Sequence, residues 1–126
     1  MTWGPVNTRK QFGFLLLEKA KKALEQLDDQ SIGSLQAYLN TYGNEGPSTM
    51  IELRWLRPEG RHGGGRHVWA IAYKQVRLYG GELTLDGLRT FVGVEIVKKK
   101  TRRADQELLH RVANALNELE AKGRLQ

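Results

Sequence analysis

The sequence contains no cysteine. This absence excludes disulfide frameworks, thiolate nucleophiles and every zinc or iron–sulfur site built on cysteine. Long apolar runs are also lacking, because the longest candidate, residues 14–17, is interrupted at once by Glu18 and Lys19, far short of the roughly 20 residues that span a bilayer. The first ten residues lack the segments of an export signal. We therefore expect a cytoplasmic protein that does not enter a membrane.

The chain has the length and composition of one folded domain. It has 126 residues, of which 40% are hydrophobic and 27% are charged. That length falls within the usual range for a single hydrophobic core, and the apolar content is too high for a disordered chain. We find no repeat, low-complexity tract or linker, so residues 1–126 are expected to form one domain.

Basic residues clearly outnumber acidic ones only in the middle of the chain. The net charge is +6, and residues 46–103 hold twelve Lys and Arg against five Asp and Glu, while the two flanking parts are close to neutral. A concentration of positive charge favours an anionic partner. The middle of the sequence is therefore where a function is expected.

Two amphipathic helices are predicted at the ends of the chain. Apolar residues recur at three- and four-residue spacing from Thr8 to Leu27, after a capping pattern at Thr8 and Gln11. A shorter helix is expected from Ser31 to Gly43. The last helix is predicted from Arg102 to Lys122, with Leu109, Val112, Leu116 and Leu119 on one face.

Strands are predicted between these helices. Alternation indicates a half-buried strand over Thr49–Arg57, followed by a long loop over 58–66 and a central strand from Val68 to Tyr73 that continues toward Tyr79. Gly80-Gly81 is expected to form a tight hairpin turn, residues 82–85 to pair back, Asp86-Gly87 to turn again, and Thr90–Lys98 to form the last strand.

The resulting fold class is α+β. We expect an N-terminal helix pair, an antiparallel meander of three or four strands, and a long C-terminal helix packed on the sheet, with the terminal helices on one face.

The loop at 57–67 is the most unusual segment. It carries four glycines and the residues Arg57, Arg61, Arg66 and His67, with Arg54 just before it. A flexible basic hairpin tip suits contacts to a phosphate backbone, which need charge and hydrogen-bond donors more than rigid geometry. The alternative is an ordinary solvated loop.

A second basic cluster lies where the last strand meets the last helix. Positive charges at a helix N-terminus oppose the helix dipole, so an external anion would relieve them. The cluster consists of Lys98, Lys99, Lys100, Arg102 and Arg103. The alternative is a solvated junction. The aromatic residues nearby on the predicted strands are more typical of a core than of base stacking.

These observations predict a non-catalytic protein that binds nucleic acid, DNA or RNA. The predicted binding residues are Arg54, Arg57, Arg61, Arg66, His67, Lys98, Lys99, Lys100, Arg102 and Arg103. No recognition helix is evident, so specific reading of a duplex sequence is not expected.

Two other functions remain open. The chain is alternatively a protein–protein adaptor or assembly subunit, in which the terminal helices form a homodimer through Leu109, Val112, Leu116 and Leu119. The minor alternative is a metal-dependent nuclease that uses Glu52, Asp86 and Glu95, although Lys98 lies three residues after Glu95, where such nucleases have two.

No metal or other cofactor is expected. His62 and His67 have no obvious further ligands beside them. Residues 60–65 lack the Lys-Ser/Thr ending of a phosphate-binding loop, and no helix is predicted to follow them.

Overall fold

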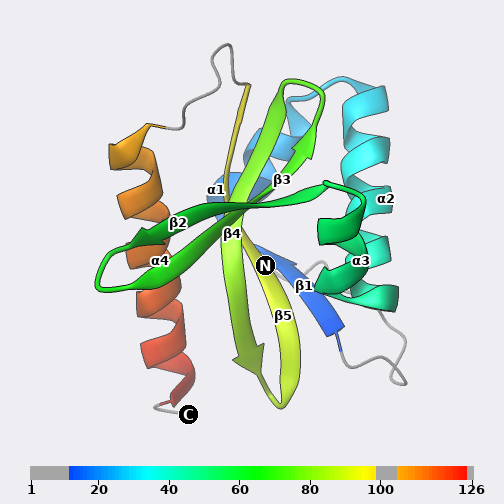
Figure 1. Cartoon of the computed structure of the whole chain (residues 1–126). Helices are drawn as coiled ribbons and strands as arrows, with labels where there is room; N and C mark the ends of the chain where they lie inside the picture. The colour runs from blue at the N-terminus through cyan, green and yellow to red at the C-terminus, as the bar shows by residue number, and fades with distance from the viewer. Residues whose placement is uncertain (1–11, 99–104, 125–126) are drawn as a thin grey trace.

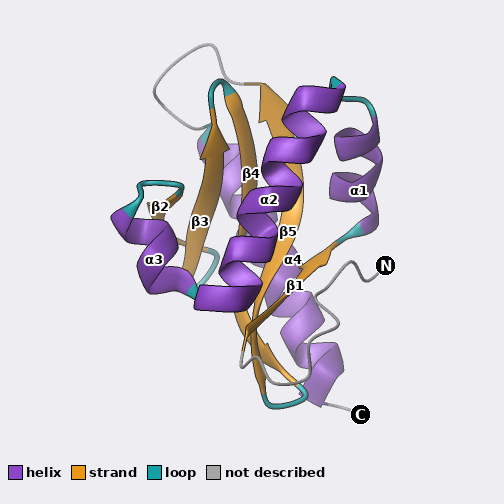
Figure 2. Cartoon of the chain, turned by 90° about the vertical axis from the view of Figure 1, so that its right-hand side faces the viewer, coloured by secondary structure: helices purple, strands orange, loops and turns teal. Residues whose placement is uncertain are grey.

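The computed structural model describes residues 12–98 and 105–124, and it shows a five-stranded sheet with helices on both faces (Figures 1 and 2). The elements are β1 (Phe12–Leu16), α1 (Glu18–Glu25), α2 (Asp29–Glu45), α3 (Pro47–Glu52), β2 (Leu56–His62), β3 (Arg66–Tyr73), β4 (Val76–Leu85), β5 (Leu88–Lys98) and α4 (Gln106–Arg124). The strand order is β1-β5-β4-β3-β2. β1 is parallel to β5, and the other neighbours are antiparallel. The fold is α+β, but the expected helix pair followed by an antiparallel meander is wrong.

The described part of the chain begins with a strand, where a helix was expected from Thr8 to Leu27. Phe14 and Leu16 are buried in alternation, as in a strand, and the β1–β5 ladder pairs Phe12 with Arg89. Gly13 allows this pairing, because a Cβ atom there would lie 2.8 Å from Leu88. The apolar residues of β1 and α1 together resemble the spacing of one helix. The backbone of Leu17 is extended, however, and it separates the two elements.

The segment expected to be a strand at Thr49–Arg57 begins as a helix. Gly46 has a positive φ angle and Pro47 follows it at the first helical position, which suits proline. Of the alternating apolar residues expected to face the core, Ile51 and Leu53 have exposed side chains, and Trp55 packs against the core. Met50 is buried instead. β2 starts only at Leu56.

Most of the expected loop at 58–66 is strand. β2 continues to His62, with a bulge between Pro58 and Arg61, and the turn to β3 spans only residues 63–65. All four glycines of this segment have positive φ angles. The bulge and the turn require positive φ angles at these positions. Glycine adopts such angles without strain, whereas other residues adopt them at a cost in energy.

The Gly80-Gly81 pair lies inside β4, not in a turn. A Cβ atom at Gly80 would come 1.9 Å from the carbonyl oxygen of Val92, and one at Gly81 would come 3.0 Å from the carbonyl oxygen of His67 and 2.6 Å from the side chain of Leu116. β4 and β5 carry a register shift at this point. The glycines are needed for close approach of backbones. The hairpin turn lies earlier, at 74–75, while the expected turn at Asp86-Gly87 is confirmed.

The helices cover opposite faces of the sheet, so the expectation of one shared face is wrong (Figure 2). α1 and α2 contribute Ala20, Leu24, Leu35 and Leu39 to one core cluster. α4 contributes Leu109, Val112 and Leu116 to the other, together with Val68, Tyr79 and Val92 from the strands. No helix in the described ranges has the length and hydropathy needed to cross a membrane.

Candidate nucleic-acid interface

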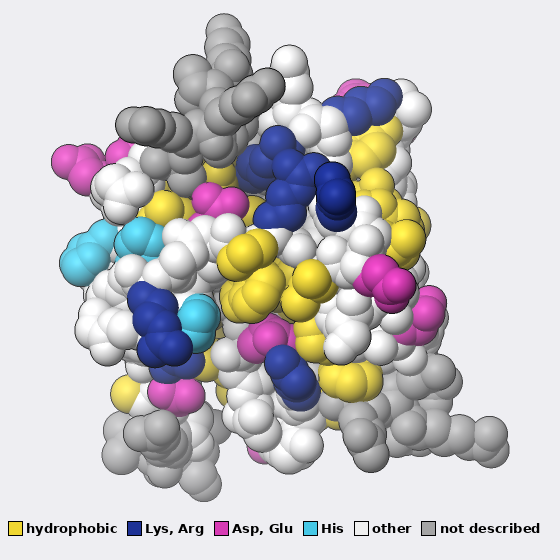
Figure 3. Space-filling view, viewed as in Figure 1, with side chains coloured by type: hydrophobic (Ala, Val, Ile, Leu, Met, Phe, Trp, Pro, Cys, Tyr) yellow, Lys and Arg dark blue, Asp and Glu magenta, His cyan; other side chains and the backbone are white. Residues whose placement is uncertain are grey.

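Basic side chains from three strands gather at the end of the sheet where β3 turns into β4. Ala72 pairs with Arg77 across the β3–β4 ladder, and its backbone N–H donates to the carbonyl oxygen of Trp55, next to Arg54. Lys98 pairs with Val76 at the end of β5, so it lies at the same end of the sheet but on the face that α1 and α2 cover. Figure 3 shows Lys and Arg side chains grouped on this part of the surface. We call this group the basic end; it consists of Arg54, Arg57, Lys74, Arg77 and Lys98.

Two guanidinium groups of the basic end are held by backbone carbonyls. The Nε of Arg57 donates to the carbonyl oxygen of Arg54 at 3.0 Å. One terminal nitrogen of Arg77 donates to the carbonyl oxygens of Lys74 and Val76. These bonds fix the orientation of each group and leave most of its donors available, because a guanidinium carries five N–H groups.

Within residues 12–98 and 105–124, none of the five residues of the basic end forms an ion pair with an acid. Two acids act at longer range: Asp28 is electrostatically linked to Lys98, and Glu59 and Arg77 both act on the Tyr79 hydroxyl. Burial and the carboxylate of Glu59 raise the pKa of Tyr79, and Arg77 opposes them. The charge of the basic end therefore faces solvent largely uncompensated.

Aromatic rings beside the basic end are engaged in the core. Tyr79 is buried, and the ring of Trp55 stacks on Tyr38 with centroids 4.0 Å apart. Tyr73 contacts Tyr38 edge to face and has the Lys74 ammonium over its ring. The surface offers cations and hydrogen-bond donors, with few free aromatic faces for stacking on bases.

The turn between β2 and β3 is attached to α4, in contrast to the expected flexible basic tip. Arg66 donates to the side-chain oxygen of Asn117 and forms an ion pair with Glu120. Asn117 donates in turn to the carbonyl oxygen of Gly63 at 2.8 Å. Arg66 is thus a structural residue whose charge is already paired.

The remaining predicted binding residues are divided among three places. Arg61 and His67 are exposed and pair with each other across the β2–β3 ladder, away from the basic end. Lys98 belongs to the basic end. Lys99, Lys100, Arg102 and Arg103 lie outside the described residues. The last helix begins at Gln106, where Asp105 accepts a hydrogen bond from the backbone N–H of Glu107.

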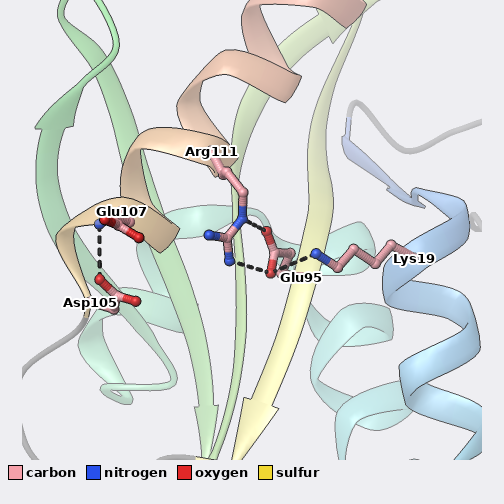
Figure 4. A network of polar contacts seen from close by, with 5 residues as sticks. All are labelled: Lys19, Glu95, Asp105, Glu107 and Arg111. Carbon is pink, nitrogen blue, oxygen red and sulfur yellow. Dashed lines mark hydrogen bonds and ion pairs between the residues drawn. The ribbon is translucent and has the colours of Figure 1, made fainter.

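Glu95 serves as an electrostatic link between helices (Figure 4). Its buried carboxylate accepts two hydrogen bonds from Arg111 on α4, at 3.0 and 3.1 Å, and lies 3.1 Å from the ammonium of Lys19 on α1. Burial would raise the pKa of Glu95, but Arg111 and Lys19 outweigh it and lower the pKa below its usual value. The ionised carboxylate therefore stabilises the fold.

The acids considered for a nuclease are not brought together. Glu52 is exposed on α3, Asp86 lies in the β4–β5 turn, and Glu95 is occupied by Arg111 and Lys19. His62 contacts the carbonyl oxygen of Glu59 through a ring nitrogen. In the described part of the chain, no three His, Asp or Glu residues are arranged to hold a metal ion.

The side chains proposed for a helical dimer lie in the core of the same chain. Leu109, Val112 and Leu116 are buried against the sheet of the same chain, and Leu119 is partly buried beside them. A homodimer through these residues would require the core to open.

Sequence reasoning missed Lys74 and Arg77 as members of the site. Their sequence neighbourhood carries no motif, and their place beside Arg54 and Arg57 depends on the β3–β4 register. The only early signal was their inclusion in the excess of positive charge between residues 46 and 103.

An open cleft lies at the opposite end of the sheet, between the β2–β3 turn, the second half of β4 and the C-terminal part of α4. Its volume is about 1350 Å³. Residues that line it include Trp69, Leu83, Thr84, Leu85 and Leu119, together with three acids and three bases: Glu82, Asp86, Glu120, Arg66, Arg89 and Lys122.

Comparison of the chain with models of protein families, with characterised proteins and with solved structures found no match.

Proposed function

We propose that this protein binds nucleic acid through phosphate contacts made by the basic end. The observation that carries the proposal is that Arg54 and Arg57, on either side of the start of β2, meet Arg77 of β4 without an ion-paired acid among the described residues. Unpaired guanidinium groups held in fixed orientations suit phosphate oxygens, which accept several hydrogen bonds at once. The ligand would be met in the cytoplasm.

Binding is proposed to depend little on base sequence. Phosphate contacts position a protein on nucleic acid without reading its sequence, and specificity comes from contacts to base edges or from stacking. Near the basic end, Tyr79 is buried and Trp55 is stacked on Tyr38, which favours backbone contacts over base contacts.

The test compares two charge reversals that change the net charge equally. Arg57→Glu alters the basic end, whereas Lys22→Glu alters an exposed position on α1. Anisotropy of labelled single-stranded and duplex DNA and RNA is measured at low and moderate salt. We expect Arg57→Glu to weaken binding by on the order of tenfold and to reduce the salt slope by about one, because one phosphate contact is lost. Lys22→Glu should have little effect.

Equal effects of the two reversals would contradict the proposed site, because they would indicate a response to net charge alone. The absence of binding to all four ligands at low salt would contradict the function itself.

A further inference from the structure

Among the described residues, a short edge of β4 has no strand beside it. The ladder between β3 and β4 ends at the pair Trp69 and Gly80, because β3 then continues along β2 toward the turn at 63–65. Residues 82–85 go on as a strand, paired with β5 on one side only among the described residues. Figure 1 shows the β4–β5 hairpin diverging from the β2–β3 hairpin at this level.

The direction of the backbone groups follows from the turn at Asp86-Gly87. Both turn residues have positive φ angles, as a two-residue hairpin of type I′ requires, and Leu85 and Leu88 close it. The closing pair of such a hairpin exchanges hydrogen bonds, so the alternating residues Glu82 and Thr84 direct their N–H and C=O groups away from β5. Thr84 is exposed and lines the cleft.

The β3–β4 hairpin gives the same direction for the backbone groups of β4. The two-residue turn at 74–75 makes Tyr73 and Val76 a closing pair that exchanges hydrogen bonds. Every second pair of the ladder does the same, so the N–H and C=O groups of Gly80 point toward Trp69. Counting from the other hairpin also turns Gly80 away from β5. The two hairpins therefore agree on which residues of β4 face the cleft.

Side chains around this edge differ between its two sides. On one side stand Leu83 and Leu85 of β4 with Leu119 of α4; on the other, Glu82 is held by Arg89 through two hydrogen bonds, beside the ring of Trp69. Three acids and three bases balance in the lining, and Arg66–Glu120 and Arg89–Glu82 are ion pairs. This balance is unfavourable to a polyanion and complementary to a segment of low net charge.

We propose that the cleft binds an extended peptide segment of a partner protein, which adds as a strand to β4 at Glu82–Leu85. Its apolar side chains lie toward Leu83, Leu85 and Leu119, and its alternate polar side chains lie toward Glu82 and Arg89. Strand addition of this kind takes its affinity from main-chain hydrogen bonds and its specificity from every second side chain. No residue of the basic end lines the cleft, so this site is separate from the proposed nucleic-acid interface.

The probe is a displayed library of random linear peptides of about twelve residues, selected against the whole protein and then synthesised with a fluorescent label. Thr84→Pro removes the N–H that faces the cleft, whereas the bonds to β5 are made by Leu83 and Leu85. Thr84→Val keeps that N–H and is the control. We expect selected peptides to alternate apolar and polar residues and to bind Thr84→Pro at least tenfold more weakly than Thr84→Val.

Amide hydrogen exchange of the unaltered protein gives a second measurement, which does not depend on the variant folding. Bound peptide should slow exchange at Thr84. Binding that Thr84→Pro leaves unchanged, or that fails to protect the Thr84 amide, would overturn the proposal, as would the failure of any peptide to be selected. A dimer that forms through this edge and is lost in Thr84→Pro would also overturn it, in favour of a second copy of the chain.

Discussion

The side-chain amide of Asn117 on α4 donates a hydrogen bond of 2.8 Å to the carbonyl oxygen of Gly63 in the β2–β3 turn. The same amide accepts a hydrogen bond from Arg66 through its oxygen, so one side chain satisfies both ends of the turn. A Cβ atom at Gly63 would lie 2.9 Å from Ala113, which leaves only a glycine room against the helix. The glycine-rich segment is thus a fitted contact between a hairpin and a helix.

Asn117→Ala should destabilise the protein by about 1–2 kcal/mol, because two partly buried hydrogen bonds are lost and Arg66 keeps only Glu120. The control is Asn40→Ala, at an exposed position of α2, which makes the same gain in helix propensity. Urea unfolding followed by circular dichroism measures both. A free energy of unfolding that is the same in the two variants would show that the turn is not held by Asn117.

Glu95→Gln should lower the free energy of unfolding at neutral pH by about 1–3 kcal/mol, since Arg111 and Lys19 lose a buried charged partner. The pKa of Glu95 is lowered in the folded state. The stability that its ionised carboxylate contributes is therefore complete above the ordinary pKa of about 4.5, and it is lost as the pH falls through the lowered pKa of the folded protein. The difference between the two proteins should therefore shrink in acid.

Urea unfolding over a series of pH values measures this difference. Glu118→Gln, at an exposed position of α4, is the control and should follow the unaltered protein at every pH. A gap for Glu95→Gln that stays constant down to strongly acidic pH would refute the electrostatic role.

Gly80→Ala should cost about 3 kcal/mol or more, or prevent folding, because the new methyl group would meet the Val92 carbonyl oxygen on an adjacent backbone that cannot rotate away. Gly33→Ala is the matched control. Gly33 lies in α2 with no atom near a Cβ position, so alanine there should stabilise the protein by about 0.5–1 kcal/mol. Thermal unfolding compares them, and effects of the same sign would contradict the close approach of β4 and β5.

Tyr42→Phe should destabilise the protein by about 1–2 kcal/mol. The buried Tyr42 hydroxyl donates to Glu82, which also binds Arg89, and burial together with Glu82 raises the pKa of Tyr42. Tyr38→Phe removes a hydroxyl from a ring that acts by stacking on Trp55 and should change stability by only a few tenths of a kcal/mol. If the free energy of unfolding falls equally in the two variants, the hydrogen bond from Tyr42 to Glu82 makes no net contribution to stability.

Local pattern was sufficient for some elements and misleading for others. The strands over 68–73 and 90–98 and the body of α4 follow the periodicity of their own residues. β1 does not, because its strand state depends on pairing with β5, far along the chain. The same holds for Gly80, whose role is set by Val92 and not by its neighbours in sequence.

The candidate site was predictable to a similar extent. The excess of basic residues in the middle of the sequence is visible by counting, but counting does not separate paired from unpaired charges. Arg66 was predicted to bind a ligand and is held by Glu120 instead. Arg77 was overlooked, although its guanidinium lies at the basic end and forms no ion pair with an acid among the described residues. Both facts depend on strand register and on helix packing, which are tertiary properties.

The parallel pairing of β1 with β5 sets an order of events during synthesis. Phe12 pairs with Arg89, so the first strand leaves the ribosome long before its partner exists. Three helices and three other strands are made in the interval. Contacts so distant in sequence form slowly, because the entropy cost of closing a long loop comes before the contacts can stabilise the chain. The hydrophobic segment FGFLL must therefore wait unpaired in the nascent chain, and closure of the sheet by β1 is expected to be a late step of folding.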